Sequence, residues 1–388
     1  MNYILFDDQK VRNGLLPLTF TRPVADIRFG ISTMREKWER ILGAETSTLT
    51  ESYLRKKFPV VKGDTNILIN SSVCPSENLL AQIQALGTNQ ALVGDVKVIA
   101  MNLSGDNLDA MDTSETTEVK LDAETICINH VWDLFAKLDI TIDSDFKCIT
   151  KGRKSQPVSE TNKIIGDNPI FIEEGAVVEY AFLNATNGPI YIGKDAEVME
   201  SSVIRGPFAL GEHSVVRAGT KIYGPTSIGP HSKVGGEISN SLIIGYSNKA
   251  HDGFIGNSVL GEWCNLGAGT NVSNLKNTYD TVRIWSHHQE TFVNTGLQFC
   301  GLIMGDHSKT SINTMLNTGT VVGVSANLFG SGFPRQFVSS FSWGGFSGLK
   351  KYNLNKALQV AEIVYARRDK VFDNIEKDIL RNVYNLTL

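Results

Sequence analysis

The sequence predicts an α/β domain at the N-terminus, then a parallel β-helix, then a C-terminal helix. Three observations lead to this prediction. Segments with strand and helix periodicity alternate at first, aliphatic residues then recur at every sixth position, and one amphipathic helical pattern follows. The 35 glycines against 11 prolines also indicate many regular tight turns. The expected domains are 1–160, 161–340 and 341–388.

The first domain carries short apolar runs that predict strands and two periodic segments that predict helices. The strands are NYILF (2–6), TNILIN (65–70), QALVG (90–94) and VKVIAM (96–101), and the helices are STMREKWERIL (32–42) and SENLLAQIQAL (76–86). Ser76 is the expected entry to the second helix. Residues 104–119 are polar and predict a surface loop, and the polar stretch 151–162 predicts a linker.

Hexads dominate the middle of the chain, and their phase breaks and returns twice. The positions are Ile192, Val198, Ile204, Leu210, Val216, Ile222, Ile228 and Val234, then Leu260, Leu266 and Val272, then Met304, Thr310, Leu316, Val322 and Leu328. Neither a helix nor an ordinary strand has a period of six, so each hexad is expected to form a short strand and a corner of a triangular coil. The hexad residue should point inward, and residues 273–301 should loop out.

The end of the chain predicts one more helix, after FSWGG (341–345). Its apolar face runs from Leu354 to Ile379. We expect this helix to cover the open end of the β-helix.

Composition excludes several classes of protein. A net charge of −4 argues against a non-specific nucleic-acid binder. No stretch approaches the roughly 20 apolar residues of a membrane span, and the N-terminus resembles neither a signal nor a transit peptide. The five cysteines lack metal-ligand spacing, as in reduced cytosolic proteins. We therefore expect a cytoplasmic protein with no nucleic-acid or membrane partner.

A polar segment within the hexads carries the clearest motif. Its parts are KAHDGFIG (249–256), NLGAGT (265–270) and Ser273-Asn274. They resemble the acetyltransferase domain of the bifunctional N-acetylglucosamine-1-phosphate uridyltransferase/glucosamine-1-phosphate acetyltransferase family. The resemblance implies that His251 is the catalytic residue and that Asn265 and Asn274 bind substrate. It also implies a left-handed β-helix, acetyl-CoA as co-substrate and a homotrimer.

The chemistry of these residues agrees with acetyl transfer to an amine. Histidine titrates near neutral pH, so His251 can take the proton that the amine loses as it attacks the thioester. The glycine-rich backbone around Ala268 can approach the acetyl group closely enough to stabilise the oxyanion. Asparagines suit sugar hydroxyls and phosphate. The alternative for His251 is a polar corner histidine without a catalytic role.

Other candidates in this region follow from position or charge. Asn313 and Thr318 lie where the family binds acetyl-CoA. Lys249 is a candidate for substrate phosphate, and it is equally an ordinary solvated lysine. His287 and His288 lack a third ligand at metal spacing, so we expect them at the surface.

The N-terminal segment LLPLTFTRPVADIRFG (15–30) resembles part of the sugar-phosphate nucleotidyltransferases, without their Gly-rich phosphate loop. The cations that could replace this loop in substrate binding are Arg12, Arg22, Arg28 and Lys37, and the alternative is surface salt bridges. The segment INHVWDL (128–134) resembles a magnesium site of that family, with Asn129 as the ligand. The family's aspartate after the strand 65–70 is absent.

These observations predict an enzyme of sugar-nucleotide biosynthesis. We expect it to transfer acetyl from acetyl-CoA to glucosamine 1-phosphate, and a uridylyl group from UTP to N-acetylglucosamine 1-phosphate with Mg²⁺. One alternative is that only one half is active. Another is a non-enzymatic module that binds sugar nucleotides.

Overall fold

The computed structural model describes residues 2–94, 97–104, 116–122 and 124–387. Contacts divide the chain into two compact units. The first contains residues 1–15, 21–27 and 32–130, and the second contains residues 16–20, 28–31 and 131–388. Residues 131–160 thus group with the β-helix rather than with the first expected domain. None of the described helices combines the length and apolar character needed to cross a bilayer.

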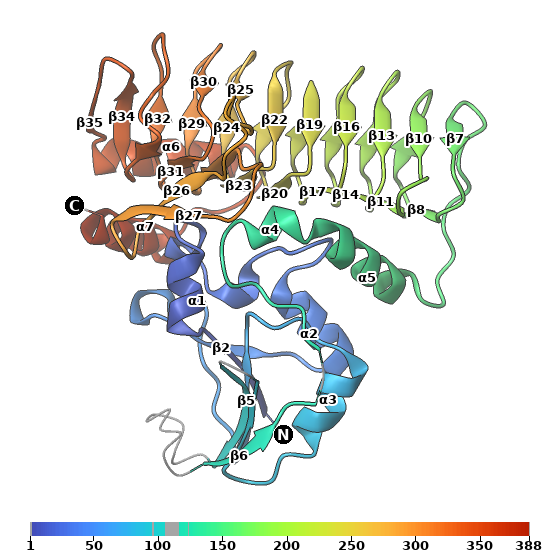
Figure 1. Cartoon of the computed structure of the whole chain (residues 1–388), viewed down its shortest axis with the longest axis vertical. Coiled ribbons are helices and arrows are strands. Elements are labelled where there is room, and N and C mark those ends of the chain that lie inside the picture. Colours follow the sequence, from blue (N-terminus) through green and yellow to red (C-terminus); the bar gives the residue numbers. More distant parts are fainter. Residues whose placement is uncertain (1, 95–96, 105–115, 123, 388) are drawn as a thin grey trace. The chain divides into compact units, whose positions relative to one another are not determined.

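The first unit is an α/β domain built on a six-stranded mixed sheet (Figure 1). Its strands, in sheet order, are β2 (Ser47–Leu49), β1 (Asn2–Phe6), β3 (Thr65–Asn70), β5 (Val98–Ser104), β4 (Gln90–Val93) and β6 (Thr117–Lys120). Strand β1 runs parallel to β2 and β3, whereas β5 runs antiparallel to β3 and β4. The helices are α1 (Gln9–Gly14), α2 (Met34–Leu42) and α3 (Glu77–Gln84).

The predicted elements of this unit are present. Helix α2 begins at a capping box between Thr33 and Glu36, and α3 begins at Ser76, whose side chain accepts a hydrogen bond from Leu79 N. Strand β6 lies at the end of the predicted polar loop. The rest of that loop, residues 105–115, lies outside the described residues, as does Val96 at the start of VKVIAM.

The second unit is a parallel β-solenoid whose coils contribute strands to three faces (Figure 1). The first face contains β7 (Lys163–Ile165), β10 (Phe182–Asn184), β13 (Val203–Arg205), β16 (Lys221–Tyr223), β19 (Glu237–Ser239) and β22 (Phe254–Gly256). The second face contains β8 (Ile170–Ile172), β11 (Ile190–Ile192), β14 (Phe208–Leu210), β17 (Thr226–Ile228), β20 (Leu242–Gly245), β23 (Val259–Glu262), β28 (Leu302–Met304), β31 (Thr320–Val322) and β33 (Phe337–Val338). The third face contains β9 (Val177–Val178), β12 (Glu197–Val198), β15 (Val215–Val216), β18 (Lys233–Val234), β21 (Asn248–Lys249), β24 (Asn265–Leu266), β29 (Lys309–Thr310), β32 (Asn327–Leu328), β34 (Ser342–Gly345) and β35 (Gly348–Lys351). A further pair joins β25 (Asn271–Val272) to β30 (Met315–Leu316).

The hexad residues form the core of the solenoid, as predicted. Every hexad residue from Ile192 to Val234 is at most 1% exposed, because coils above and below cover it. The phase breaks after Val234 because the corner between β18 and β19 holds only Gly235 and Gly236. Interior positions continue through this break, and they include Ile238, Ile243, Lys249 and Ile255.

The predicted excursion at 273–301 is an antiparallel hairpin of β26 (Arg283–Ser286) and β27 (Thr291–Asn294). Beyond the solenoid, the chain forms two helices rather than one, α6 (Leu354–Ala366) and α7 (Asn374–Leu386). The break follows Asp369, which has a φ of 55°, and α7 begins where the Asp373 side chain caps it.

Stacked rings line the corner between the second and third faces. His213, His231, Tyr246 and Trp263 occupy equivalent corner positions on successive coils, and neighbouring ring centroids lie 4.9, 4.8 and 4.4 Å apart. Tyr365 of α6 stacks on Trp263 at 4.0 Å. Helix α6 therefore packs along the flank of the solenoid, and the expectation that it covers the open end is wrong.

Helices α4 (Asp133–Ala136) and α5 (Leu138–Thr150) also belong to this unit. Residues 28–31 lie between α5 and the solenoid. The carboxylate of Asp145 accepts a hydrogen bond from Ile31 N at 2.8 Å, and Ser227 Oγ donates to Gly30 O at 2.6 Å. Gly30 has a φ of 91°, and a Cβ there would lie 2.7 Å from the Asp145 carboxylate, so this close approach requires glycine.

Candidate functional site

A cleft of about 700 Å³ lies on the third face of the solenoid, between β18, β21, β24, β29 and the end of α6. The lining includes three residues expected from the sequence, His251, Asn265 and Ala268. Four cationic side chains also line it: Lys233, Lys309, Arg367 and Arg368. The cleft thus combines a histidine, amide groups and cations.

The floor of the cleft is a column of outward-facing residues on successive strands. Lys233 pairs in register with Asn248, Asn248 with Asn265, and Asn265 with Lys309. Parallel strands lie about 4.8 Å apart, so polar groups recur at this interval along the cleft. Each of the four precedes an inward-facing residue, which explains why all of them point outward.

His251 lies on the corner that follows β21. Its side chain is exposed, and its imidazole forms no hydrogen bond with the residues that the structure describes. The next coil fixes this corner, because Gly269 N donates to Asp252 O at 2.9 Å. No hydrogen bond joins the side chain of Asp252 to His251 within the described chain. The imidazole is therefore accessible to a ligand in the cleft.

Ala268 lies on the equivalent corner of the next coil and offers a backbone donor. Gly267 N is bonded to Thr310 O and Gly269 N to Asp252 O. The N–H of Ala268 has no acceptor among the described residues. Ala268 lines the same cleft as His251, and an unpaired backbone N–H is the kind of donor that can stabilise a developing oxyanion.

The cations of the cleft have no carboxylate partner among the residues that the structure describes. None of Lys233, Lys309, Arg367 and Arg368 forms an ion pair within the described part of the chain. Burial and the neighbouring Arg367 lower the pKa of Arg368, whose guanidinium donates to Asn248 Oδ1 at 3.2 Å. Burial also lowers the pKa of Lys309. An anionic ligand would relieve both effects.

The expectation that Lys249 binds a substrate phosphate is wrong, because its side chain lies inside the solenoid. It occupies an interior position of the solenoid, in register with Val234, and is 2% exposed. Its ammonium donates to Gly235 O at 2.9 Å and to His251 O. Burial lowers its pKa to about 8.

Three other expected residues of the solenoid lie outside the lining of the cleft. Asn274 donates to Asn257 Oδ1 at 2.8 Å, at another corner. Thr318 is buried, and its hydroxyl pairs with Ser273 Oγ at 2.7 Å, so the expected role in binding acetyl-CoA is wrong for this residue. Asn313 is exposed on the corner next to Ala268, and its N–H donates to Ala268 O.

His287 also differs from expectation. Its ring nitrogens are buried and have no hydrogen-bond partner among the described residues. Phe20 and Phe337 pack edge-on against the ring, at 5.5 and 5.4 Å. Burial lowers the pKa of His287 to about 4. His288 is exposed, as predicted.

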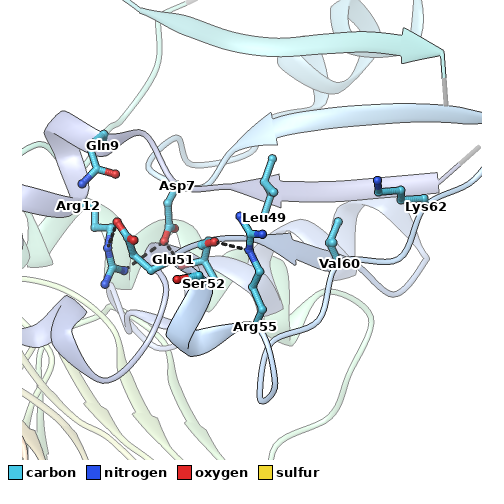
Figure 2. A pocket seen from close by; sticks show the side chains of 10 residues that line it. Asp7, Gln9, Arg12, Leu49, Glu51, Ser52, Arg55, Val60 and Lys62 are labelled. Atoms are coloured by element: carbon cyan, nitrogen blue, oxygen red, sulfur yellow. Dashed lines mark hydrogen bonds and ion pairs between the residues drawn. The ribbon is translucent and has the colours of Figure 1, made fainter. Parts of the chain in front are cut away.

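A second cavity, of about 400 Å³, lies in the first unit beyond the carboxyl ends of β1 and β2 (Figure 2). Ligands bind at this edge in open α/β sheets. Arg12 lines the cavity, but its guanidinium lies 3.3 Å from the Asp7 carboxylate and donates to Tyr53 Oη at 2.9 Å. Burial raises the pKa of Asp7, and the positive charge of Arg12 offsets only part of this rise. Arg55 and Lys62 also line the cavity (Figure 2).

The other cations expected to hold phosphate do not line this cavity. Arg28 groups with the solenoid unit, where its guanidinium donates to Ile244 O at 3.1 Å and to Ile31 O. Its expected role in substrate binding is therefore wrong. Arg22 and Lys37 are buried, at 5% and 7% exposed.

The residues near Asn129 do not fit a magnesium ion. The Asn129 amide oxygen accepts a hydrogen bond from the Lys97 ammonium at 3.2 Å, and the same ammonium donates to Ser72 Oγ at 3.1 Å. Magnesium requires oxygen ligands, usually with a carboxylate. Strand β3 ends at Asn70 and is followed by Ser71 and Ser72, so no carboxylate stands at this point of the sequence. The described residues also hold no group of three His, Cys, Asp or Glu side chains that could bind a metal.

Sequence reasoning missed the cations of the cleft. Lys233 and Lys309 could have been found, because each directly precedes an inward hexad position. Arg367 and Arg368 carried no such signal, because tertiary contacts such as the packing of Tyr365 on Trp263 bring α6 to the third face.

Comparisons with known proteins agree with this architecture. Residues 3–154 match the family described as sugar nucleotidyl transferase. This match confirms the expectation of a nucleotidyltransferase-like domain, and with it the transferase class for this part of the chain.

Relatives of known description are similar over shorter stretches. The chain is 30% identical, over 174 residues, to a bifunctional sugar-1-phosphate nucleotidylyltransferase/acetyltransferase of Sulfurisphaera tokodaii. The aligned stretch covers 44% of this chain and 42% of that protein. It is 33% identical, over 87 residues, to the bifunctional protein GlmU of Methanococcus aeolicus, and this stretch covers 22% of this chain and 20% of that protein. The chain thus spans less than half the length of these relatives.

Among solved structures, the polysialic acid O-acetyltransferase OatWY matches 50% of this chain and 89% of its own. The identity is 18% and the TM-score 0.31. LpxA, a UDP-N-acetylglucosamine acyltransferase from Bacteroides fragilis, matches 59% of this chain and 82% of its own. The identity is 13% and the TM-score 0.20.

Proposed function

We propose that this protein is an enzyme of sugar-nucleotide biosynthesis whose solenoid transfers acetyl from acetyl-CoA to the amine of a sugar phosphate, with glucosamine 1-phosphate as the acceptor. The observation that carries the proposal is that His251 and Ala268 line one cleft, whose cations form no ion pair with the described residues and whose Ala268 N–H has no acceptor among them. Both acetyl-CoA and a sugar phosphate are phosphorylated, so the cations suit them.

The transfer proceeds by attack of the amine nitrogen on the thioester carbonyl carbon. His251 takes the proton that the nitrogen loses, and the Ala268 N–H donates to the oxyanion of the tetrahedral intermediate. The carbon–sulfur bond then breaks, the amide forms, and the thiolate of CoA accepts a proton. Asn265, beside these groups on the floor of the cleft, is suited to a sugar hydroxyl.

Thiol release from acetyl-CoA in the presence of glucosamine 1-phosphate tests this proposal. His251→Ala should lower kcat by roughly 10² or more, the scale of a lost general base. His213→Ala is the matched control, because that histidine is an exposed corner residue outside the cleft. No thiol release with any amino-sugar phosphate would refute acetyl transfer, and full activity of His251→Ala would refute the role of the base.

For the first unit we propose uridylyl transfer from UTP to N-acetylglucosamine 1-phosphate, on the support of the family match over residues 3–154. The cavity at the carboxyl ends of β1 and β2, with Arg55 and Lys62 at its rim, suits a phosphorylated substrate. Release of pyrophosphate that depends on both substrates is the test.

A second candidate is that only the acetyltransferase half is active and that the first unit binds a sugar nucleotide without turnover. Two observations favour it. The Arg12 guanidinium is engaged by Asp7 and Tyr53, and an ammonium holds the oxygen of Asn129. Thiol release without pyrophosphate release would select this candidate, whereas binding of a sugar nucleotide with neither reaction would select the non-enzymatic module.

A further inference from the structure

The ammonium of Lys97 lies at the end of β3, in a setting built from neutral oxygens. Strand β5 pairs antiparallel with β3, which brings Lys97, just before β5, to the carboxyl end of β3. Asn70 Oδ1 accepts hydrogen bonds from Ser72 N at 3.0 Å and Ser72 Oγ at 2.7 Å. Ser72 Oγ in turn accepts from Lys97 at 3.1 Å. The serine is thus held in place before any ligand binds.

The segment around Asn129 completes this setting. Ile128 N donates to Ser72 O at 2.9 Å, so the segment is fixed against the end of β3. Asn129 Oδ1 then accepts from Lys97 at 3.2 Å. An ammonium has three donors, and these two bonds use only two of them. Lys97 forms no ion pair within the described part of the chain, so its charge has no counter-ion there.

The positive charge at this point has a functional consequence. A divalent cation on Ser72 Oγ and Asn129 Oδ1 would have to displace the ammonium or sit beside it, and no carboxylate of the described residues pairs with that ammonium to offset the repulsion. A phosphate group, in contrast, would accept from the third donor of Lys97 and neutralise its charge. The donor set therefore selects an anion and rejects a divalent metal.

We propose that the first unit binds a phosphate ester through the ammonium of Lys97, with Ser72 and Asn129 holding that ammonium in place, and that this binding requires no divalent metal ion. The inference rests on the proposed function of the unit as a binder of phosphorylated sugars or nucleotides. It goes beyond that function by replacing the metal with a side chain of this chain.

The experiment measures binding of pyrophosphate, UTP and N-acetylglucosamine 1-phosphate to the full-length protein by calorimetry, in EDTA and in excess Mg²⁺. We expect at least one probe to bind in EDTA, with a Kd within about threefold of that in Mg²⁺. Lys97→Gln should weaken this binding at least tenfold, and Lys97→Arg should retain most of it, because a charge-assisted hydrogen bond to phosphate contributes on that scale. Lys120→Gln, which changes an exposed lysine on β6, is the matched control.

The possible outcomes of the calorimetry distinguish the inference from the proposed function of the unit. Binding that appears only with Mg²⁺, or that Lys97→Gln leaves unchanged, overturns the inference while the proposed function of the unit stands. Failure of all three probes to bind under either condition overturns both. Titration with Mn²⁺, followed by its electron paramagnetic resonance, supplies an independent readout. We expect no Mn²⁺ immobilised by the protein with the bound probe, and an immobilised ion that is lost in Asn129→Ala would refute the proposal.

Discussion

Replacing Lys249 by methionine isolates the free energy of one buried charge. Methionine has a similar length and is apolar, so it can fill the interior position between the coils of Val234 and Leu266. The change removes the ammonium and with it the hydrogen bonds to Gly235 O and His251 O. At neutral pH the substitution has two opposing effects on the free energy of unfolding. It removes the cost of burying a charge, and it leaves two carbonyl oxygens without their donor, so the stability at a single pH is a poor test.

The dependence on pH separates these two effects. The pKa of Lys249 falls from 10.5 to about 8 on folding, because burial disfavours the charged form. Between these values the unfolded chain keeps the proton that the folded protein has lost, so stability rises with pH. The shift corresponds to a gain of about 3 kcal/mol between pH 8 and pH 10.5. Lys249→Met should lack this gain.

The assay is urea-induced unfolding of both proteins at pH 7.5, 9 and 10.5, with the difference in free energy of unfolding taken at each pH. Other titrating groups are common to both proteins and cancel. Lys221→Met, at an exposed position on β16, is the control and should show no such trend. A difference between Lys249→Met and the parent that stays constant with pH would refute the interior position of the charge.

Two further predictions follow from the solenoid unit. Arg368→Gln should raise the KM of acetyl-CoA or of the sugar phosphate by about tenfold and leave kcat nearly unchanged, because it removes one charged contact to a bound anion. Steady-state kinetics with each substrate varied in turn checks this, and an unchanged KM for both would contradict it. The free energy of unfolding should fall by about 3 kcal/mol as the pH drops from 6.5 to 4, because His287 stays neutral in the fold and gains a proton when unfolded. His287→Phe should reduce this loss, and an unaltered acid profile would show that other groups cause it.

The solenoid could be predicted because its rule is local and repeated. A single inward residue in each hexad is enough to specify the coil, and every hexad residue from Ile192 to Val234 is buried as expected. Helix α5 was not predicted, since its β-branched residues weaken the helical signal and its packing near β17 is a tertiary effect. The side of the solenoid that α6 covers was equally hidden, because tertiary contacts such as the stacking of Tyr365 on Trp263 decide it.

In the candidate site, too, local motifs could be predicted from the sequence, whereas effects of tertiary packing could not. His251, Asn265 and Ala268 belong to two short motifs close together in the sequence, and the structure brings them into one cleft. Lys249 was misassigned because the short corner at Gly235-Gly236, one coil earlier, shifts the hexad phase, so its inward register could not be counted from Val234. Charge alone could not distinguish it from a solvated lysine.

The stacking of α6 on the flank also changes how the second unit unfolds. A solenoid of nearest-neighbour coils frays from its ends, since each coil depends only on those beside it. Here α6 ties the chain end back to much earlier coils, through Tyr365 on Trp263 and Arg368 on Asn248. The coils bridged in this way, from β21 to β24, must open as one cooperative block, so their amides should exchange with deuterium at a common slow rate. The early coils at β7 and β8 lie outside this tie and should exchange first.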